Sequence, residues 1–201
     1  MKKLFCMLTL LVLAGCKPEL KGTLSVRSPL PVMVKGQMVQ IPVGNYRAEY
    51  TAGDKATFAV LKVENVSGQT LKIQLSFPAG QTAPQYYGDL NIASHVSGQP
   101  FDIVGKIDTE HDQSDLYYGS QSCTYYLNEY TCHKPKDGPQ VCGYESVPHT
   151  GSQPTQYYYS TSSTSAVSSF RRPGTNIEMA TFSGYESDST KHETPIGPCS
   201  Y

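Results

Sequence analysis

Hydrophobic and polar side chains alternate along residues 22–78 with the period of two that is typical of half-buried β-strands. The alternation is most regular over residues 71–77, where single polar residues separate Leu, Ile, Leu and Phe. Turn-forming residues interrupt it at short intervals, for example at 35–37 and 65–69. Connections this short join antiparallel strands and leave no room for helical crossovers. The pattern predicts an antiparallel β unit over residues 23–78.

The second half of the chain has a weaker pattern. From residue 79 onward Tyr, Ser and Gln become more frequent, and candidate strands remain at residues 89–94, 101–107 and 177–182. Residues 160–169 are almost all Ser, Thr or small residues, which indicates an exposed loop. We therefore predict a mainly β protein, an antiparallel sandwich or barrel-like domain with a loop-rich, disulfide-stapled C-terminal half. Residues 79–201 either form a separate region or pack with residues 23–78 as one domain.

The first sixteen residues follow a third pattern. Lys2 and Lys3 precede a short hydrophobic run, and the run ends at Leu13-Ala14-Gly15-Cys16. A positive start, a short hydrophobic segment and small residues at the end are the parts of a secretory signal. The run is too short to cross a bilayer, which takes about 20 residues. The four final residues resemble the lipobox of bacterial lipoprotein signal peptides.

This resemblance implies a lipid anchor. Residues 1–15 would be removed as a signal peptide, Cys16 would carry a diacylglyceryl group and an N-acyl chain, and residues 16–22 would form a short tether. Two or three acyl chains hold a protein on a membrane almost irreversibly. Lys17 follows the lipidated position, which by the same resemblance favours the outer membrane. The orientation, towards the periplasm or the cell surface, stays open.

Composition narrows the choice of partners. The chain has 16 Lys and Arg against 17 Asp and Glu, and a formal net charge of −1. It lacks a block of basic residues, which argues against a nucleic-acid partner. It contains 15 Tyr but no Trp, and only 16% of its residues are charged. We therefore expect a surface rich in hydroxyl and amide groups, as in exported β proteins and in antibody-like binding surfaces.

Four cysteines remain once Cys6 and Cys16 are set aside: Cys123, Cys132, Cys142 and Cys199. An even number in an exported protein predicts two disulfides, for which three pairings exist. A hairpin turning at Leu127-Asn128 would bring Cys123 opposite Cys132. The turn signal Lys136-Asp137-Gly138 instead favours a bridge between Cys132 and Cys142, although prolines stand on both sides of it. The predicted pairing is Cys123–Cys132 with Cys142–Cys199.

Catalytic and metal-binding motifs are scarce. The sequence has no G-x-S-x-G elbow, no H-E-x-x-H pair, no phosphate-binding glycine loop and no C-x-x-C pair. Asp108, Glu110 and Asp112 form a weak Ca²⁺ candidate, but the spacing fails the EF-hand pattern. A solvated acidic loop is the preferred interpretation. We predict no metal and no cofactor apart from the covalent lipid on Cys16.

Clustered tyrosines are the positive indication of a binding surface. On a strand, adjacent residues point to opposite faces, so each cluster would bury one ring and expose another. An exposed ring combines apolar area with a hydroxyl and suits protein or sugar recognition. The candidate binding residues are Tyr117, Tyr118, Tyr125, Tyr126, Tyr157, Tyr158 and Tyr159.

These observations favour an outer-membrane lipoprotein with a non-enzymatic binding or scaffolding role at the cell envelope, acting on a protein or glycan partner. One alternative is an inhibitor of a periplasmic or surface hydrolase, since small disulfide-containing β lipoproteins serve against lysozymes; the motif of that family is absent. A second alternative is an enzyme of unrecognised type that uses His95, His111 and nearby carboxylates.

Overall fold

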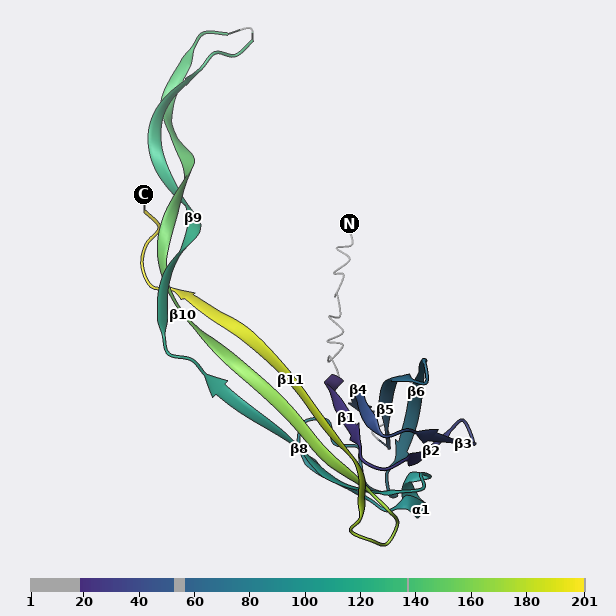
Figure 1. Cartoon of the computed structure of the whole chain (residues 1–201). Helices are drawn as coiled ribbons and strands as arrows, with labels where there is room; N and C mark the ends of the chain where they lie inside the picture. The colour runs from purple at the N-terminus through teal and green to yellow at the C-terminus, as the bar shows by residue number, and fades with distance from the viewer. Residues whose placement is uncertain (1–18, 53–56, 137, 201) are drawn as a thin grey trace, which may run out of the picture. The chain divides into compact units, whose positions relative to one another are not determined.

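The computed structural model describes residues 19–52, 57–136 and 138–200. The predicted signal peptide, residues 1–15, and the lipidation candidate Cys16 lie outside these ranges. The described residues are mainly antiparallel β-strands, and two disulfides lie in the C-terminal half, which confirms the predicted fold class (Figure 1). None of the described helices is long and apolar enough to cross a membrane.

Most strands belong to one sheet. In chain order the elements are β1 (Glu19–Val26), β2 (Leu30–Val34), β3 (Gln37–Ile41), β4 (Gly44–Ala52), β5 (Phe58–Val66), β6 (Gln69–Ser76), β7 (Gly88–Ile92), α1 (Ser94–Ser97), β8 (Asp102–Gln113), β9 (Tyr117–His133), β10 (Val141–Arg171) and β11 (Glu178–Pro195). The strand order in the sheet is β6-β5-β4-β1-β11-β10-β8-β7, with β9 paired to β10. Strands β2 and β3 form a separate hairpin.

The chain divides into two compact units. Unit 1 comprises the chain up to Thr109 together with Ser163–Glu186, and unit 2 comprises Glu110–Ser162 together with Ser187–Tyr201. The divisions fall within β8, β10 and β11 rather than in loops. Each unit therefore combines segments that are far apart in the sequence.

The strands expected in residues 23–78 are present in unit 1. The β2–β3 hairpin turns at Lys35 and Gly36, whose φ angles of 51° and 80° are those of a tight hairpin turn. In β5 the alternate residues Ala59, Leu61 and Val63 are buried, as the pattern predicts. The sheet begins earlier than expected, however. Strand β1 starts at Glu19 and buries Leu20, so residues 19–22 belong to the sheet and not to the tether.

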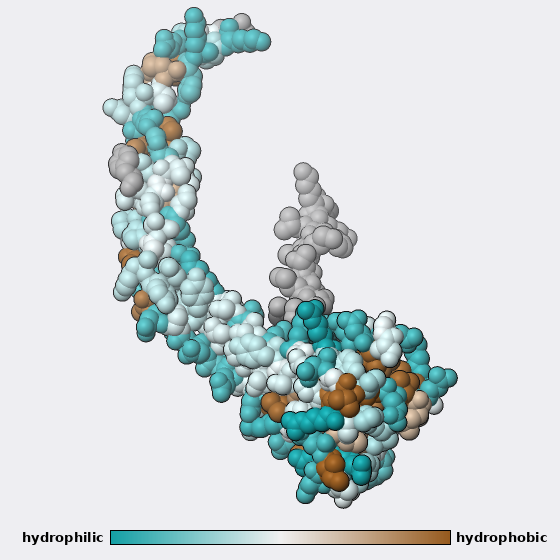
Figure 2. Space-filling model, in the orientation of Figure 1, coloured by the Kyte–Doolittle hydropathy of each residue, from teal (hydrophilic) through white to brown (hydrophobic). Residues whose placement is uncertain are grey.

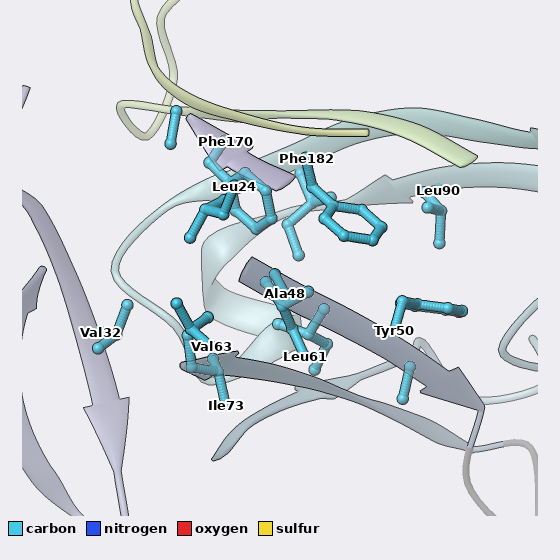
Figure 3. Packing of buried hydrophobic residues seen from close by; sticks show 14 of the residues in the cluster. Leu24, Val32, Ala48, Tyr50, Leu61, Val63, Ile73, Leu90, Phe170 and Phe182 are labelled. Atoms are coloured by element: carbon cyan, nitrogen blue, oxygen red, sulfur yellow. The ribbon is translucent and has the colours of Figure 1, made fainter. Parts of the chain in front are cut away.

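Unit 1 contains a hydrophobic core. Side chains from every described strand except β9 pack together in one cluster, which Figure 3 shows in part. The rings of Phe101 and Phe170 meet edge to face with centroids 5.2 Å apart. Tyr50 is buried and donates a hydrogen bond from its hydroxyl to the Pro84 carbonyl oxygen, 3.1 Å away. Burial also raises the pKa of the Tyr50 phenol, because the ionised form would lose its hydration.

Two glycines allow the sheet of unit 1 to curl. Gly22 of β1 lies opposite Gly184 of β11 in the ladder. A Cβ on Gly22 would collide with the Ser183 carbonyl, and a Cβ on Gly184 would lie 2.6 Å from the Phe182 ring. A strand glycine of this kind marks a place where backbones approach closely, as at the corner of a barrel. The pair therefore permits the half-barrel curvature of the sheet.

Residues 160–169 are not the loop that their composition indicated. They lie within β10, a strand that lies between β11 and β8 in the sheet. Thr164, Ala166 and Ser168 face inward and are buried, in line with Phe170. The inward positions do alternate, but they are small or hydroxylated, so a hydropathy pattern does not detect them.

Candidate functional site

Unit 2 is built around a long hairpin of β9 and β10. All residues from 117 to 133 pair with residues 157 to 141 in one register without a bulge. Because side chains alternate between the two sides of a strand, odd-numbered side chains of both strands share one face and even-numbered ones share the other. We call these the odd face and the even face. Among the described residues of unit 2, Thr155 alone is buried, so neither face covers a core.

The predicted disulfide pairing is wrong. The bonds are Cys132–Cys142 and Cys123–Cys199. The hairpin does not turn at Leu127-Asn128, since both residues lie inside β9. It turns between His133 and Val141, at the competing turn signal. Pro135 and Pro139 are outside the ladder there, so their missing N–H groups cost no strand pairing.

Cys132 and Cys142 are direct partners in the ladder, with Cα atoms 4.0 Å apart. A disulfide between directly paired strand residues was therefore expected correctly, but it joins Cys132 to Cys142 and not to Cys123. Cys123 instead holds the end of the chain through Cys199, 76 residues later. Both bridges lie in unit 2.

Gly151 makes room for the second bridge. It lies opposite Cys123 in the ladder, and Ser152 next to it exchanges two backbone hydrogen bonds with Ser200, of 2.7 and 3.0 Å. A Cβ on Gly151 would collide with the Ser200 carbonyl oxygen and would lie 2.8 Å from the Tyr125 ring. Only glycine lets the C-terminal segment pass this close to β10 while Cys199 reaches Cys123.

The odd face carries an aromatic cluster where β9 begins. The Tyr117 and Tyr157 rings stack with centroids 5.5 Å apart, and Tyr159 meets the Tyr157 ring edge to face at 5.9 Å. The Lys191 ammonium lies 4.1 Å from the centre of the Tyr157 ring. A cation over a tyrosine face is attracted by the negative potential of the ring.

A second contact fixes this lysine. Its Nζ lies 2.7 Å from the Glu193 carboxylate, which also accepts a hydrogen bond of 2.8 Å from the Thr155 hydroxyl. The hydrogen bond from Lys191, followed by that from Thr155, lowers the pKa of Glu193, and Glu193 in turn raises the pKa of Lys191. The cluster is thus internally paired, which favours a structural role for Tyr117, Tyr157 and Tyr159.

Two further candidate tyrosines also have ring partners. Tyr158 stacks on His192 with centroids 4.8 Å apart, and the His192 ring nitrogen lies 2.8 Å from the Ser160 hydroxyl. Tyr125 stacks on His149 at 5.6 Å. These pairs lie on opposite faces, so adjacency in sequence did not place the predicted tyrosines on one common surface.

The even face is the most exposed aromatic surface of the hairpin. Tyr118 and Tyr126 are 72% and 65% exposed. Tyr130 and Tyr144, which the sequence reading missed, lie on the same face at 61% and 77%. They are direct ladder partners, and their rings meet edge to face at 5.3 Å. Neither has a tyrosine neighbour in sequence; only the correct hairpin register would have paired them. We call Tyr118, Tyr126, Tyr130 and Tyr144 the even-face tyrosines.

The weak Ca²⁺ candidate receives no support from the geometry. Asp108, Glu110 and Asp112 lie in strand β8 and not in a loop, and Asp108 forms an ion pair with Lys106. Within the described ranges, no three His, Cys, Asp or Glu side chains gather closely enough to hold a metal ion. His95 lies in α1 and His111 in β8.

Figure 2 shows the visible surface along β9 and β10 as mostly hydrophilic or near neutral, with isolated hydrophobic residues. The chain matches no protein-family model, no curated protein and no solved structure. Its function must therefore be argued from its own residues.

Proposed function

We propose that the chain is a lipid-anchored protein of the bacterial outer membrane that binds or scaffolds a protein or glycan of the cell envelope, without catalysing a reaction. The observation that carries the binding part is the even face of unit 2. Four tyrosines, each more than 60% exposed, lie there on one face of the β9–β10 hairpin. A folded domain ordinarily exposes such rings singly, so an aligned set is informative.

Tyrosine suits this role for physical reasons. Its ring offers a large apolar contact area, its hydroxyl forms hydrogen bonds, and only two side-chain torsions must be fixed on binding. The edge-to-face contact of Tyr130 and Tyr144 already restricts both rings. Pre-arranged side chains lose less entropy when a partner binds.

The anchor part of the proposal rests on Leu13-Ala14-Gly15-Cys16. Two or three acyl chains on Cys16 would give almost irreversible membrane attachment. Only Lys17 and Pro18 separate Cys16 from Glu19, the first residue of β1. The anchor would therefore hold unit 1 close to the lipid surface.

Intact mass spectrometry of detergent-extracted protein tests the anchor. The wild type is expected to lack residues 1–15 and to carry a diacylglyceryl-sized gain, and Cys16→Ser is expected to lose that gain. An unlipidated wild type would overturn the anchor and leave the binding proposal intact.

A triple variant tests the binding surface: Tyr126→Ser, Tyr130→Ser and Tyr144→Ser together. Tyr87→Ser is the matched control, because Tyr87 is 74% exposed but lies in unit 1. The probes are purified peptidoglycan sacculi and immobilised, detergent-solubilised outer-membrane proteins. We expect the wild type and the control to bind one of them and the triple variant to bind at least about tenfold more weakly, about 1.4 kcal/mol. Equal binding by all three proteins would refute the assignment.

A further inference from the structure

Strand β9 leaves one of its edges unpaired. Its partner is β10, and in the described part of the chain no other strand lies along β9 (Figure 1). At 17 residues it is a long edge strand. An edge of this kind presents a row of free N–H and C=O groups, which is a template for pairing with another strand.

The backbone groups that face this edge can be identified. Ser152 of β10 bonds to Ser200 through both its N–H and its C=O, so these groups point away from β9. Its ladder partner Ser122 is therefore part of a non-hydrogen-bonded pair, and its own N–H and C=O point away from β10. Because the ladder has no bulge, every even residue of β9 directs its backbone groups to the free edge.

The two edges of the hairpin are protected differently. On β10 the outward positions include Pro148 and Pro154, which have no N–H to offer, and beyond Ser152 the C-terminal segment covers the edge. Natural sheets use proline and lysine in this way to prevent unwanted pairing. Strand β9 contains no proline, no lysine and no arginine, and Glu129 is its one carboxylate. The protection is confined to β10.

We propose that the free edge of β9 pairs antiparallel with β9 of a second copy of this chain. The inference starts from the backbone geometry of β9, and it depends neither on the lipid anchor nor on the binding of another envelope molecule by the even-face tyrosines. Pairing along the full strand sets residue 117 against residue 133 of the other copy, with the two-fold axis at residue 125.

This register avoids like-charge contacts and sets large residues of the even face against small ones. Glu129 lies opposite the neutral Gln121 of the second copy, so no like charges meet directly. On the even face Tyr126 lies opposite Thr124, and Tyr130 lies opposite Ser120. On this face each ring thus faces a smaller residue, which leaves room for cross-strand packing, while on the odd face Tyr125 meets its own copy at the two-fold axis.

Pairing would also relieve a weakness of the hairpin. An isolated two-stranded ribbon is marginally stable in water, whereas three or more strands hold together better. Two copies would form a four-stranded sheet in the order β10-β9-β9-β10. The β10 edges, which carry the prolines, would then be the outer edges.

Asn128 and Ser146 provide a matched test, because they are direct ladder partners and both direct their N–H away from the hairpin. Asn128→Pro removes a donor from the free edge of β9, whereas Ser146→Pro makes the same change on β10. Neither change removes a hydrogen bond between the two strands. Circular dichroism and a disulfide count by mass spectrometry would confirm that both variants fold.

Sedimentation equilibrium of the full chain, in mild detergent with micelles in large excess, measures the association. We expect a dimer for the wild type and for Ser146→Pro, and a dissociation constant at least about tenfold higher for Asn128→Pro, equivalent to about 1.4 kcal/mol. A monomeric wild type, equal weakening by both prolines, or a dimer unaffected by Asn128→Pro would overturn the proposal. A wild type that stays monomeric yet binds an envelope protein would refute self-pairing and leave the proposed function of the even-face tyrosines standing.

Discussion

Unit 1 and unit 2 are made of the same kind of antiparallel strand but are stabilised by different means. Every buried hydrophobic residue among the described residues lies in unit 1, while unit 2 buries only Thr155. Unit 2 instead contains both disulfides and the chain of cross-strand aromatic contacts. Antiparallel strands can thus be held together without a hydrophobic core when disulfides and cross-strand side-chain pairs replace burial.

The comparison has a functional consequence. Unit 1 has the properties of a scaffold, because its side chains are used for packing. In unit 2 neither side of the hairpin covers a core, and the even-face tyrosines and the outer edge of β9 are exposed. The proposed binding surface and the proposed self-pairing edge therefore both belong to unit 2.

The largest effect is expected from the long-range disulfide. Replacing Cys123 and Cys199 with Ser releases a loop with a sequence separation of 76 residues, which is expected to destabilise unit 2 by about 4.5 kcal/mol. Native-state amide exchange would show the change as faster exchange in β9 and in residues 187–200. Equal acceleration in β4, β5 and β6 would show that the units do not differ in the way described.

A core substitution should act on the other unit. Phe170→Ala removes a fully buried ring that packs on Phe101 and is expected to cost about 4 kcal/mol in the free energy of unfolding of unit 1. The control Val43→Ala, at a side chain 59% exposed, is expected to stay within about 0.5 kcal/mol. Urea unfolding followed by circular dichroism measures both. Similar midpoints for the two variants would contradict the role assigned to the core.

The short-range disulfide should matter less than the long-range one. Replacing Cys132 and Cys142 with Ser opens a loop with a sequence separation of only 10 residues, so the expected loss is about 3 kcal/mol, confined to the hairpin tip. Amide exchange of residues 124–133 and 141–150 provides the measurement. A loss larger than that of the Cys123 and Cys199 double variant would reverse the order predicted from loop length.

The smallest effect is expected on the stability of unit 1 at low pH, through the carboxylate of Asp102. Asp102 accepts hydrogen bonds from the backbone N–H groups of Gly174 and Ser94, at 2.9 and 2.7 Å. The bond from Gly174, then that from Ser94, lowers the pKa of Asp102. Its contribution is therefore present in full above the ordinary pKa of an aspartate and is lost as the pH falls through the lowered value.

Asp102→Asn should remove that part of the pH dependence and cost about 1–2 kcal/mol at neutral pH, because charge-assisted hydrogen bonds are lost. Urea midpoints measured from pH 7 down to pH 2 for both proteins would test it. Parallel curves over the whole range would contradict the assignment to Asp102.

The sequence predicts the strands of residues 23–78 well because their inward positions are mostly large and hydrophobic. The alternation of Leu71, Ile73 and Leu75 reports directly on burial. The same method misreads residues 160–169, where Thr164, Ala166 and Ser168 fill the inward positions. A strand packed through small side chains has no hydropathy signal.

The sequence predicted that tyrosines form the candidate binding surface, but not which tyrosines. Clustered tyrosines indicated an aromatic surface, yet ring contacts to His149 and His192 occupy Tyr125 and Tyr158. Tyr130 and Tyr144 come together only through the register of the hairpin. That register depends on where the hairpin turns. The turn lies between His133 and Val141, whereas the sequence-based prediction placed it at Leu127-Asn128. One misplaced turn thus accounts for the wrong disulfides and for the two missing tyrosines.

Amide hydrogen exchange of the wild-type protein, with and without a reducing agent, tests the central difference between the units most directly. Reduction is expected to abolish protection in β9 and in residues 141–150 while β4, β5 and β6 keep theirs, because burial and not a disulfide holds them. Loss of protection throughout unit 1, or a hairpin that stays protected after both disulfides are reduced, would contradict the account.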